Sequence, residues 1–338
     1  MSGGAPKAFY AAPPAPADIV RWPADFGARF TIFVDTEEEF DWYAPFSRDA
    51  RATTAALALP AAHARFAAHG APLSFMVDHP IVSDLRAVDM LCQLLEDGRS
   101  SIGTQLHPWV NPPFGEEISV FNSFPGNLAQ PLEAAKLGLL TSAISAAFGR
   151  APRVYRAGRY GIGPNTAALL VEHGYRLDSS MRARYAYTHH GGPDFSAIGN
   201  HAFRFGPGGA LVELPLTTVF TGWARRLGPA LYRHSQRLPH GPGVLARLGA
   251  VARIALSPEH MPLRDAAEAV RVAVGEGVEV LNFSFHSPSL VPGHTPYVRD
   301  AADLAIFWRW WDKILSLLQR LGVVAISADE LIAQINHA

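Results

Sequence analysis

The sequence predicts an α/β fold with a largely parallel sheet, and two observations carry this prediction. Apolar, β-rich segments alternate with helix-like segments about seven times along the chain, a pattern typical of parallel strands joined by helices. Polar motifs also follow several of the expected strands. In barrel-type α/β folds the functional site lies at the carboxyl ends of the strands, so we expect these motifs to converge on one mouth.

Strands and helices alternate regularly in the first half of the chain. An apolar strand is expected over Phe30–Val34, followed by an alanine-rich helix over Asp49–Ala68. Cys92 lies in the apolar pattern of the second helix, where we expect a buried thiol. The remaining strand–helix pairs of this half are Pro72–Val77 with Ile81–Leu95, Ser101–Leu106 with Leu132–Phe148, and Arg153–Ala157 with Asn165–His173.

The second half contains a segment of unusual charge. From Leu214 to Pro258 there is no Asp or Glu, but there are six arginines, and Pro and Gly break the helical pattern. We interpret residues near 218–258 as an insertion, either a solvated cap or a basic lid for an anionic substrate or a lipid surface. The other expected elements are strands Tyr175–Leu177 and Leu211–Leu216 around an irregular stretch at 181–210, helix Leu263–Val274, strand Val278–Phe285, helix Asp300–Leu321, strand Val323–Ser327 and helix Asp329–Asn336.

Composition limits the classes of function and partner. The 338 residues are 49% hydrophobic and 17% charged, with a net charge of -1, so nothing in the overall charge attracts nucleic acid. The single cysteine excludes an intrachain disulfide and fits a reducing compartment. Residues 1–28, rich in Ala, Pro and Gly, predict an extended arm before a single domain over 29–338. The start shows no signal-peptide pattern and no apolar run is long enough to span a membrane, so we expect a cytoplasmic protein.

The first strand ends in an acid cluster. Asp35, Glu37, Glu38 and Glu39 follow the apolar run directly. A carboxylate that leaves water without a partner is destabilising by several kcal/mol, which a metal, a substrate or a water-filled mouth would offset. One acid could then hold a cation while another accepts a proton from water. The alternative is an acidic loop start in which the later acids cap the next helix.

The third strand runs into His107 and a long loop over residues 110–130. His107 is placed either to bind a metal or to position the loop by hydrogen bonds, and Gln105, two residues earlier, is a poor ligand for zinc. A loop of this length without periodicity is usually functional. Trp109, Asn122 and Asn127 supply an aromatic face and amides that suit a sugar ring, although aromatic residues also simply pack.

Arginines follow the fourth strand, and an aspartate follows the fifth. In the run Arg156-Ala157-Gly158-Arg159-Tyr160-Gly161, one arginine could orient the acid cluster by a bidentate bond or form a plain salt bridge. Asp178 could accept a bond from a histidine or an arginine, or form a turn.

The second sharpest feature is His286 at the end of a β-rich run. Its ordinary pKa lies near neutrality, so it could protonate a departing amine. Ser287 and Ser289 raise a serine hydrolase as a rival, but the chain contains no G-x-S-x-G elbow to support one.

Together these runs resemble the polysaccharide deacetylases, carbohydrate esterase family four, and a divergent branch of that family in particular. The likeness rests on VDTEEEFDW, LHPW, NSFPGN, YRAGRYG and SFHSPSL, and covers residues 29–330 in order. The resemblance implies a distorted (β/α) barrel of about seven parallel strands. It also implies a metal-dependent hydrolase that removes an acyl group, usually N-acetyl, from an amino sugar or a polysaccharide precursor.

The resemblance also implies roles for individual residues. Asp35 resembles the general base, His286 the general acid, and Glu37 and His107 the metal ligands, with Glu38 and Glu39 left as scaffold. Either Arg156 or Arg159 resembles the arginine that tunes the base. We assign this role to Arg159 and expect the substrate to contact Trp109, Asn122, Asn127, Arg156 and Tyr160.

The chain departs from the family at the metal motif. Gly103 and Gln105 occupy the two positions where a second histidine would be expected. Zinc is the cofactor that the resemblance implies. The alternative function is a carbohydrate-binding protein without turnover on the same scaffold, and Gln105 is the feature that favours it.

Overall fold

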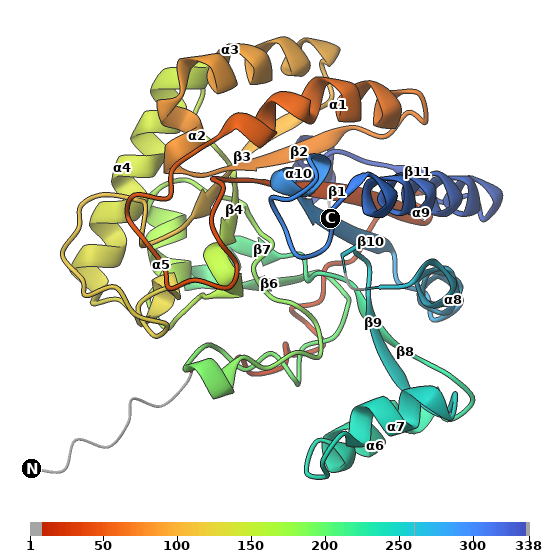
Figure 1. The fold of residues 1–338 in the computed structure, drawn as a ribbon. Coiled ribbons are helices and arrows are strands. Elements are labelled where there is room, and N and C mark those ends of the chain that lie inside the picture. The colour runs from red at the N-terminus through yellow and green to blue at the C-terminus, as the bar shows by residue number, and fades with distance from the viewer. Residues whose placement is uncertain (1–8, 260, 336–338) are drawn as a thin grey trace, which may run out of the picture.

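Nine strands of the described chain form one curled, mostly parallel sheet (Figure 1). The computed structural model describes residues 9–259 and 261–335. The first eight residues of the predicted arm, and Asn336 at the expected end of the last helix, lie outside the described residues. In spatial order the strands are β10 (Val280–His286), β1 (Arg29–Thr36), β2 (Leu73–Val77), β3 (Ser101–Leu106), β4 (Val154–Ala157), β5 (Leu177–Asp178), β7 (Leu211–Glu213) and β6 (Phe203–Phe205), with β11 (Val324–Ala325) beside the start of β1.

The sheet confirms the predicted α/β fold of the deacetylase-like barrel type, with more strands than the seven expected. All neighbours are parallel except β6, which pairs antiparallel with β7 inside the stretch that we expected to be irregular. The edge strands of the curled sheet are β10 and β6, and the segment that follows β7 lies beside β10. The seam between them is bridged by Asn282, whose backbone N–H donates to Thr217 Oγ1 and whose side chain donates to the Leu214 carbonyl.

Helices cover the outside of the sheet (Figure 1). They are α1 (Leu59–Ala67), α2 (His79–Ser83), α3 (Leu85–Leu94), α4 (Gln130–Phe148), α5 (Thr166–Glu172), α8 (Leu263–Gly275) and α9 (Ala301–Arg320). The last helix, α10 (Ala328–Ile335), packs instead against the residues on the inner side of the sheet. The expected helix over 49–68 is shorter and starts with a 3-10 turn, Thr54–Ala58. The helix expected over 81–95 is two helices, because the Asp84 side chain caps the second one. None of the described helices has the length and apolar character needed to cross a membrane.

The expectation of a buried Cys92 is wrong, since its side chain is exposed. Its neighbours Leu91 and Leu94 form the buried side of α3, and Cys92 falls on the opposite side of the helix.

Strand alternation divides the core into two clusters. Ile32 and Val34 of β1 pack outward against the helices, while Phe33 points into the barrel with Met76 and Val154. Side chains two residues apart share a face of a strand, so this inner cluster sets the side on which the following polar residues lie. Helix α10 packs against this inner cluster through Leu331, Ile332 and Ile335.

The packing of Met76 explains the glycine at position 103. A Cβ atom at Gly103 would lie 2.5 Å from the sulfur of Met76, so any larger side chain would overlap the inner cluster. A histidine at this position would require the end of the Met76 side chain to move.

The insertion projects from the barrel. Strands β8 (Thr218–Thr221) and β9 (Ala252–Ala255) form an antiparallel pair, which carries helices α6 (Gly228–Ser235) and α7 (Gly241–Arg247) at its far end (Figure 1). The strand pair was not expected in this segment.

Two glycine backbones in contact hold the long loop against the segment after β4. Gly126 donates its N–H to the Gly161 carbonyl at 2.7 Å, and a Cβ atom on Gly126 would lie 2.0 Å from the Gly163 nitrogen. We expect Gly126→Ala to lower the free energy of unfolding by about 2 kcal/mol, because backbone must shift to make room. Urea denaturation followed by circular dichroism measures this. Gly199→Ala, whose Cβ would meet nothing within 4 Å, is the matched control, and equal midpoints for the two variants would contradict the prediction.

Candidate active site

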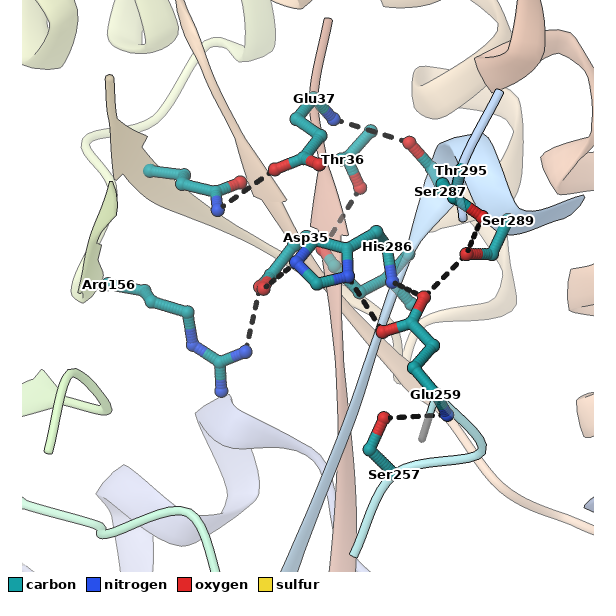
Figure 2. A network of polar contacts seen from close by, with 12 residues as sticks. Asp35, Thr36, Glu37, Arg156, Ser257, Glu259, His286, Ser287, Ser289 and Thr295 are labelled. Atoms are coloured by element: carbon teal, nitrogen blue, oxygen red, sulfur yellow. Dashed lines mark hydrogen bonds and ion pairs between the residues drawn. The ribbon is translucent and has the colours of Figure 1, made fainter. Parts of the chain in front are cut away.

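Strand register places the two proposed proton-transfer residues side by side. Asp35 is the register partner of His286 on adjacent parallel strands, β1 and β10. Both lie on the inner side of the barrel, because they follow Phe33 and Ser284 at the two-residue spacing. His286 Nε2 lies 3.6 Å from Asp35 Oδ2 (Figure 2).

A buried arginine holds Asp35. Arg156 Nη1 donates to Asp35 Oδ1 at 2.7 Å, and both residues are no more than 2% exposed. The other guanidinium nitrogens donate to the carbonyl and the hydroxyl of Ser179. Each of the three guanidinium nitrogens therefore has a partner, and Asp35 has one oxygen paired with Arg156 and the other directed toward His286.

A buried glutamate holds His286 from the other side (Figure 2). Glu259 Oε2 lies 2.7 Å from His286 Nδ1, while its Oε1 accepts from the His286 N–H and from Ser289 Oγ. Burial acts to lower the pKa of His286, but the charges of Glu259, Glu37 and Asp35 outweigh it and raise that pKa to about 10. The imidazole is consequently a cation at neutral pH, with Nε2–H directed at Asp35.

Glu37 and His107 meet at the same mouth. Glu37 Oε2 lies 3.6 Å from His107 Nε2 and 3.4 Å from Gln105 Nε2. Burial raises the pKa of Glu37 to about 8, against the lowering effect of His286 and His107. Glu37 Oε1 and Gln105 Oε1 are both buried and have no hydrogen-bond partner among the described residues.

A second acidic group lies behind His107. His107 Nδ1 is 2.8 Å from Glu38 Oε2, and Trp109 donates its indole N–H to Glu38 Oε1. Asp78 accepts the Glu38 backbone N–H at 2.8 Å. Ligand atoms of Glu38, Asp78 and His107 all lie within 4.8 Å of one another, so this buried cluster could hold a metal ion. Burial also raises the pKa of Glu38 and of Asp78.

These groups face a cavity of about 300 Å³. Asp35, Glu37, Gln105, His107 and His286 all line it. Glu38 and Asp78 do not, which places them on the protein side of His107. Aromatic side chains form much of the wall, and Trp42 packs edge-to-face against both His286 and Tyr297.

The arginine that contacts Asp35 is not the one that we expected. The contact with Asp35 that we assigned to Arg159 is made by Arg156. The backbone of Arg159 is left-handed, with φ 54°, and directs its guanidinium to Ser123 and over the ring of Phe124. Arg156 and Arg159 both line the cavity, so only the contact with Asp35 differs from our expectation.

The residues expected to contact substrate are only partly at the cavity. Tyr160 lines it and stacks on Tyr187. Trp109 reaches the wall, but stacks on His107 with ring centroids 4.4 Å apart and bonds to Glu38. Asn122 and Asn127 do not line the cavity; their amides bond backbone carbonyls of the long loop and of Gly191.

Asp178 supports the site indirectly. It accepts a short hydrogen bond from Ser180, whose hydroxyl accepts the Ala157 N–H at 2.8 Å. Asp178 and Glu213 are register partners on β5 and β7, and burial raises the pKa of both carboxyls. Asp178 therefore contacts neither His286 nor Arg156 by a hydrogen bond, and instead holds the loop on which Ser179 lies.

Sequence reasoning missed Glu259 and the role of Glu38. Glu259 is the first acid after the run from Leu214 to Pro258 that contains none, and Glu213 is the last acid before it. Both bounding acids are buried in the barrel. The position of Glu259 at the end of this acid-free run was the only feature of the sequence that could have drawn attention to it. Glu38 was expected to be scaffold, and it is a buried partner of His107.

Comparison with solved structures shows the same fold. A polysaccharide deacetylase from Mycobacterium smegmatis superposes with a TM-score of 0.58 at 13% identity, over 96% of this chain and 95% of that one. The Puue allantoinase gives 0.53 at 15% identity, over 96% and 98%. A glycoside hydrolase/deacetylase from Parabacteroides distasonis gives 0.56 at 10% identity, over 96% and 73%. No protein-family model matches the chain, and no curated protein sequence does either.

The chain therefore has the polysaccharide deacetylase fold. The neighbours confirm the resemblance of the sequence, as that of a divergent chain with low identity to each of them.

Proposed function

We propose that this protein is a hydrolase that cleaves an amide-type C–N bond, removing an acyl group such as N-acetyl from an amino sugar or a polysaccharide precursor. The observation that carries the proposal is the pair of Asp35 and His286, 3.6 Å apart at one cavity. Each has its own buried partner, Arg156 for the acid and Glu259 for the imidazole. A carboxylate and an imidazolium in this arrangement suit a base and an acid in one reaction.

The steps follow from these two groups. Asp35 Oδ2 accepts a proton from a water molecule, whose oxygen attacks the carbonyl carbon and forms the tetrahedral intermediate. His286 Nε2–H then protonates the amide nitrogen, and the C–N bond breaks to release a carboxylic acid and an amine. Arg156 and Glu259 keep the two side chains aligned, so that little reorganisation is needed during the reaction.

The donors present also fit a divalent cation. Glu37 and Gln105 each have a buried carboxyl or amide oxygen with no partner, and His107 presents Nε2 beside them. Glu38 on Nδ1 supplies the carboxylate partner that metal-binding histidines usually have on their other nitrogen. Glu37, Gln105 and His107 are favoured over the Glu38–Asp78–His107 cluster as the ligands, because the carboxylates of that cluster already take part in hydrogen bonds. A bound ion would polarise the carbonyl and acidify water, and the amide oxygen of Gln105 favours an ion harder than zinc.

The wall of the cavity supports a sugar as the substrate. Trp42, Phe40, Phe46, Tyr160 and Tyr297 line it, interleaved with Asp35, Arg159 and other polar groups. Aromatic faces with few, fixed polar groups are suited to the apolar faces and hydroxyls of a sugar ring.

Acetate release from N-acetylglucosamine and its oligomers tests the proposal. Purified protein would be assayed after chelation and after adding back zinc, manganese or cobalt, with metal content measured in parallel. We expect release that falls on chelation and recovers with at least one of the ions. Saturable binding of these sugars without release under any metal would overturn the hydrolase and support the carbohydrate-binding alternative.

The pH profile should report the Glu259–His286 pair. Glu259→Gln removes the charge that raises the pKa of His286 to about 10, so that pKa should fall toward its ordinary value near 6.5. Because the acid acts only when protonated, the alkaline limb of the profile should move to lower pH, with a loss of at least about tenfold at pH 9 relative to pH 6.

Glu279→Gln is the matched control for this measurement. It removes the same charge from a histidine, His201, whose Nδ1 lies 2.8 Å from Glu279 at the surface. The control profile should match that of the wild type, and an unmoved alkaline limb in Glu259→Gln would remove His286 from the acid role.

A further inference from the structure

The insertion has a local charge far from that of the whole protein. The segment from Leu214 to Pro258 contains six arginines and no Asp or Glu, in a chain whose net charge is -1. Arg253 lies over the rings of Tyr185 and Tyr232, and Arg225 is 3.9 Å from Glu276, so these two have partners in the fold. No acidic side chain of the described residues forms an ion pair with the other four, which are Arg226, Arg233, Arg237 and Arg247.

The same segment exposes large apolar side chains. Trp223 is 80% exposed, Leu248 69%, Leu238 64% and Leu227 63%. Val244 lies on α7 and Leu248 is the residue directly after its end, one helical turn further on. The backbone N–H of Trp223 donates to the Gly249 carbonyl, which brings Trp223 and Leu248 to the same end of the insertion. Exposed apolar groups among unpaired arginines indicate a surface that meets a partner.

The position of these residues leaves them free for a partner. Helices α6 and α7 contact each other and the β8–β9 pair, and they project beyond the body of the barrel (Figure 1). Residues 223–248 do not line the cavity of the candidate active site. The surface is therefore separate from the proposed chemistry.

We propose that residues 223–248 dock the protein on the surface of an anionic phospholipid membrane. Arginines are attracted to acidic headgroups, while an indole and leucines gain by entering the boundary with the acyl chains. A hydrated polyanion such as a nucleic acid or an acidic glycan would satisfy the arginines, but it would leave the leucines in water. The proposal does not depend on the hydrolase activity.

Vesicle flotation tests the proposal with the full chain. The vesicles are phosphatidylcholine alone, or a 7:3 mixture with phosphatidylglycerol, at about 50 and about 500 mM NaCl. We expect partition onto the anionic vesicles at low salt, loss of most of it at high salt, and no partition onto the neutral ones.

Two sets of variants separate the charged part of the surface from the apolar part. Arg226→Glu, Arg233→Glu and Arg237→Glu together should lower the partition coefficient by at least about 100-fold. Trp223→Ala with Leu248→Ala should lower it by about tenfold or more and leave its salt dependence in place.

The controls make the same change of charge, or remove an exposed apolar side chain, outside the insertion. The charge control is Arg21→Glu with Arg264→Glu and Arg309→Glu, all exposed and outside the insertion; the apolar control is Leu85→Ala, at a side chain that is 77% exposed. The apolar control should bind vesicles like the wild type. The charge control should lower the partition coefficient far less than the triple arginine variant of the insertion does. Circular dichroism checks that each variant folds.

Three results would overturn the proposal. They are absence of partition onto anionic vesicles at low salt, an equal loss for the two charge variants, and binding to heparin without binding to vesicles. A dimer in light scattering that Trp223→Ala with Leu248→Ala dissociates, without vesicle binding, would assign the surface to a second copy of the chain instead.

Discussion

Asparagine in place of Asp35 is expected to lower kcat/KM for an N-acetylated sugar by about 10³-fold or more. The amide keeps the size of the side chain and an oxygen that can accept from Arg156, so the fold should remain. It loses the ability to take a proton from water, and it removes the negative charge beside His286. Steady-state acetate release from the wild type and the variant, at equal protein and metal, measures the effect.

Asp89→Asn is the control for this substitution. Asp89 is an exposed aspartate on α3 and lies outside the cavity, so its variant should keep kcat/KM within about twofold of the wild type. A folded Asp35→Asn variant with undiminished activity would show that the base is another residue. Glu37, which lines the same cavity, would then be the next to test.

Arg156→Ala should lower the free energy of unfolding by about 3–5 kcal/mol. The substitution leaves the Asp35 carboxylate buried, at 2% exposure, without the cation that holds it. Arg159→Ala should lower it by only about 1 kcal/mol, because Arg159 contributes a loop hydrogen bond and a contact with an aromatic ring. Urea denaturation of the two variants measures this difference between two arginines that are three residues apart in the sequence.

A double-mutant cycle tests the cause of the Arg156 effect. If Arg156→Ala destabilises the protein because it leaves the Asp35 carboxylate without a cation, Asp35→Asn should lower the free energy of unfolding much less in the Arg156→Ala background than in the wild type. It should even raise that free energy if the unpaired charge is the main cause. Equal costs in both backgrounds would show that Arg156 acts through packing on Phe33, whose ring lies 4.8 Å from its guanidinium carbon. Equal destabilisation by Arg156→Ala and Arg159→Ala would also contradict the prediction.

Much of the candidate site was predictable because it lies at strand ends. Asp35, His107 and Arg156 each follow or end an apolar run, and parallel strands bring their carboxyl ends to one edge of a sheet. The alternation within β4, with Val154 inside, would also have favoured Arg156 over Arg159 as the partner of Asp35. The left-handed turn at Arg159 that sends its side chain elsewhere has no clear mark in the sequence.

Other residues could not be placed from their neighbours along the chain. Glu259 follows the insertion in a segment without regular structure. It contacts His286, which lies 27 positions later in the sequence. Glu38 alternates with Glu37, so it faces away from the cavity and meets His107 from the protein side. Asn122 and Asn127 have the composition of a binding loop, but their amides are used to hold that loop in shape.

The amino-acid sequence alone was enough to predict the α/β class, the order of most elements and the strand ends that carry acid and histidine. These properties depend on local periodicity and on the rule that parallel strands share an edge. The three-dimensional arrangement was needed for the pairings at the site, which are Arg156 with Asp35, Glu259 with His286 and Glu38 with His107. Each pairing joins residues 27 to 121 positions apart, and a buried charge takes whichever partner the packed barrel brings within hydrogen-bond distance.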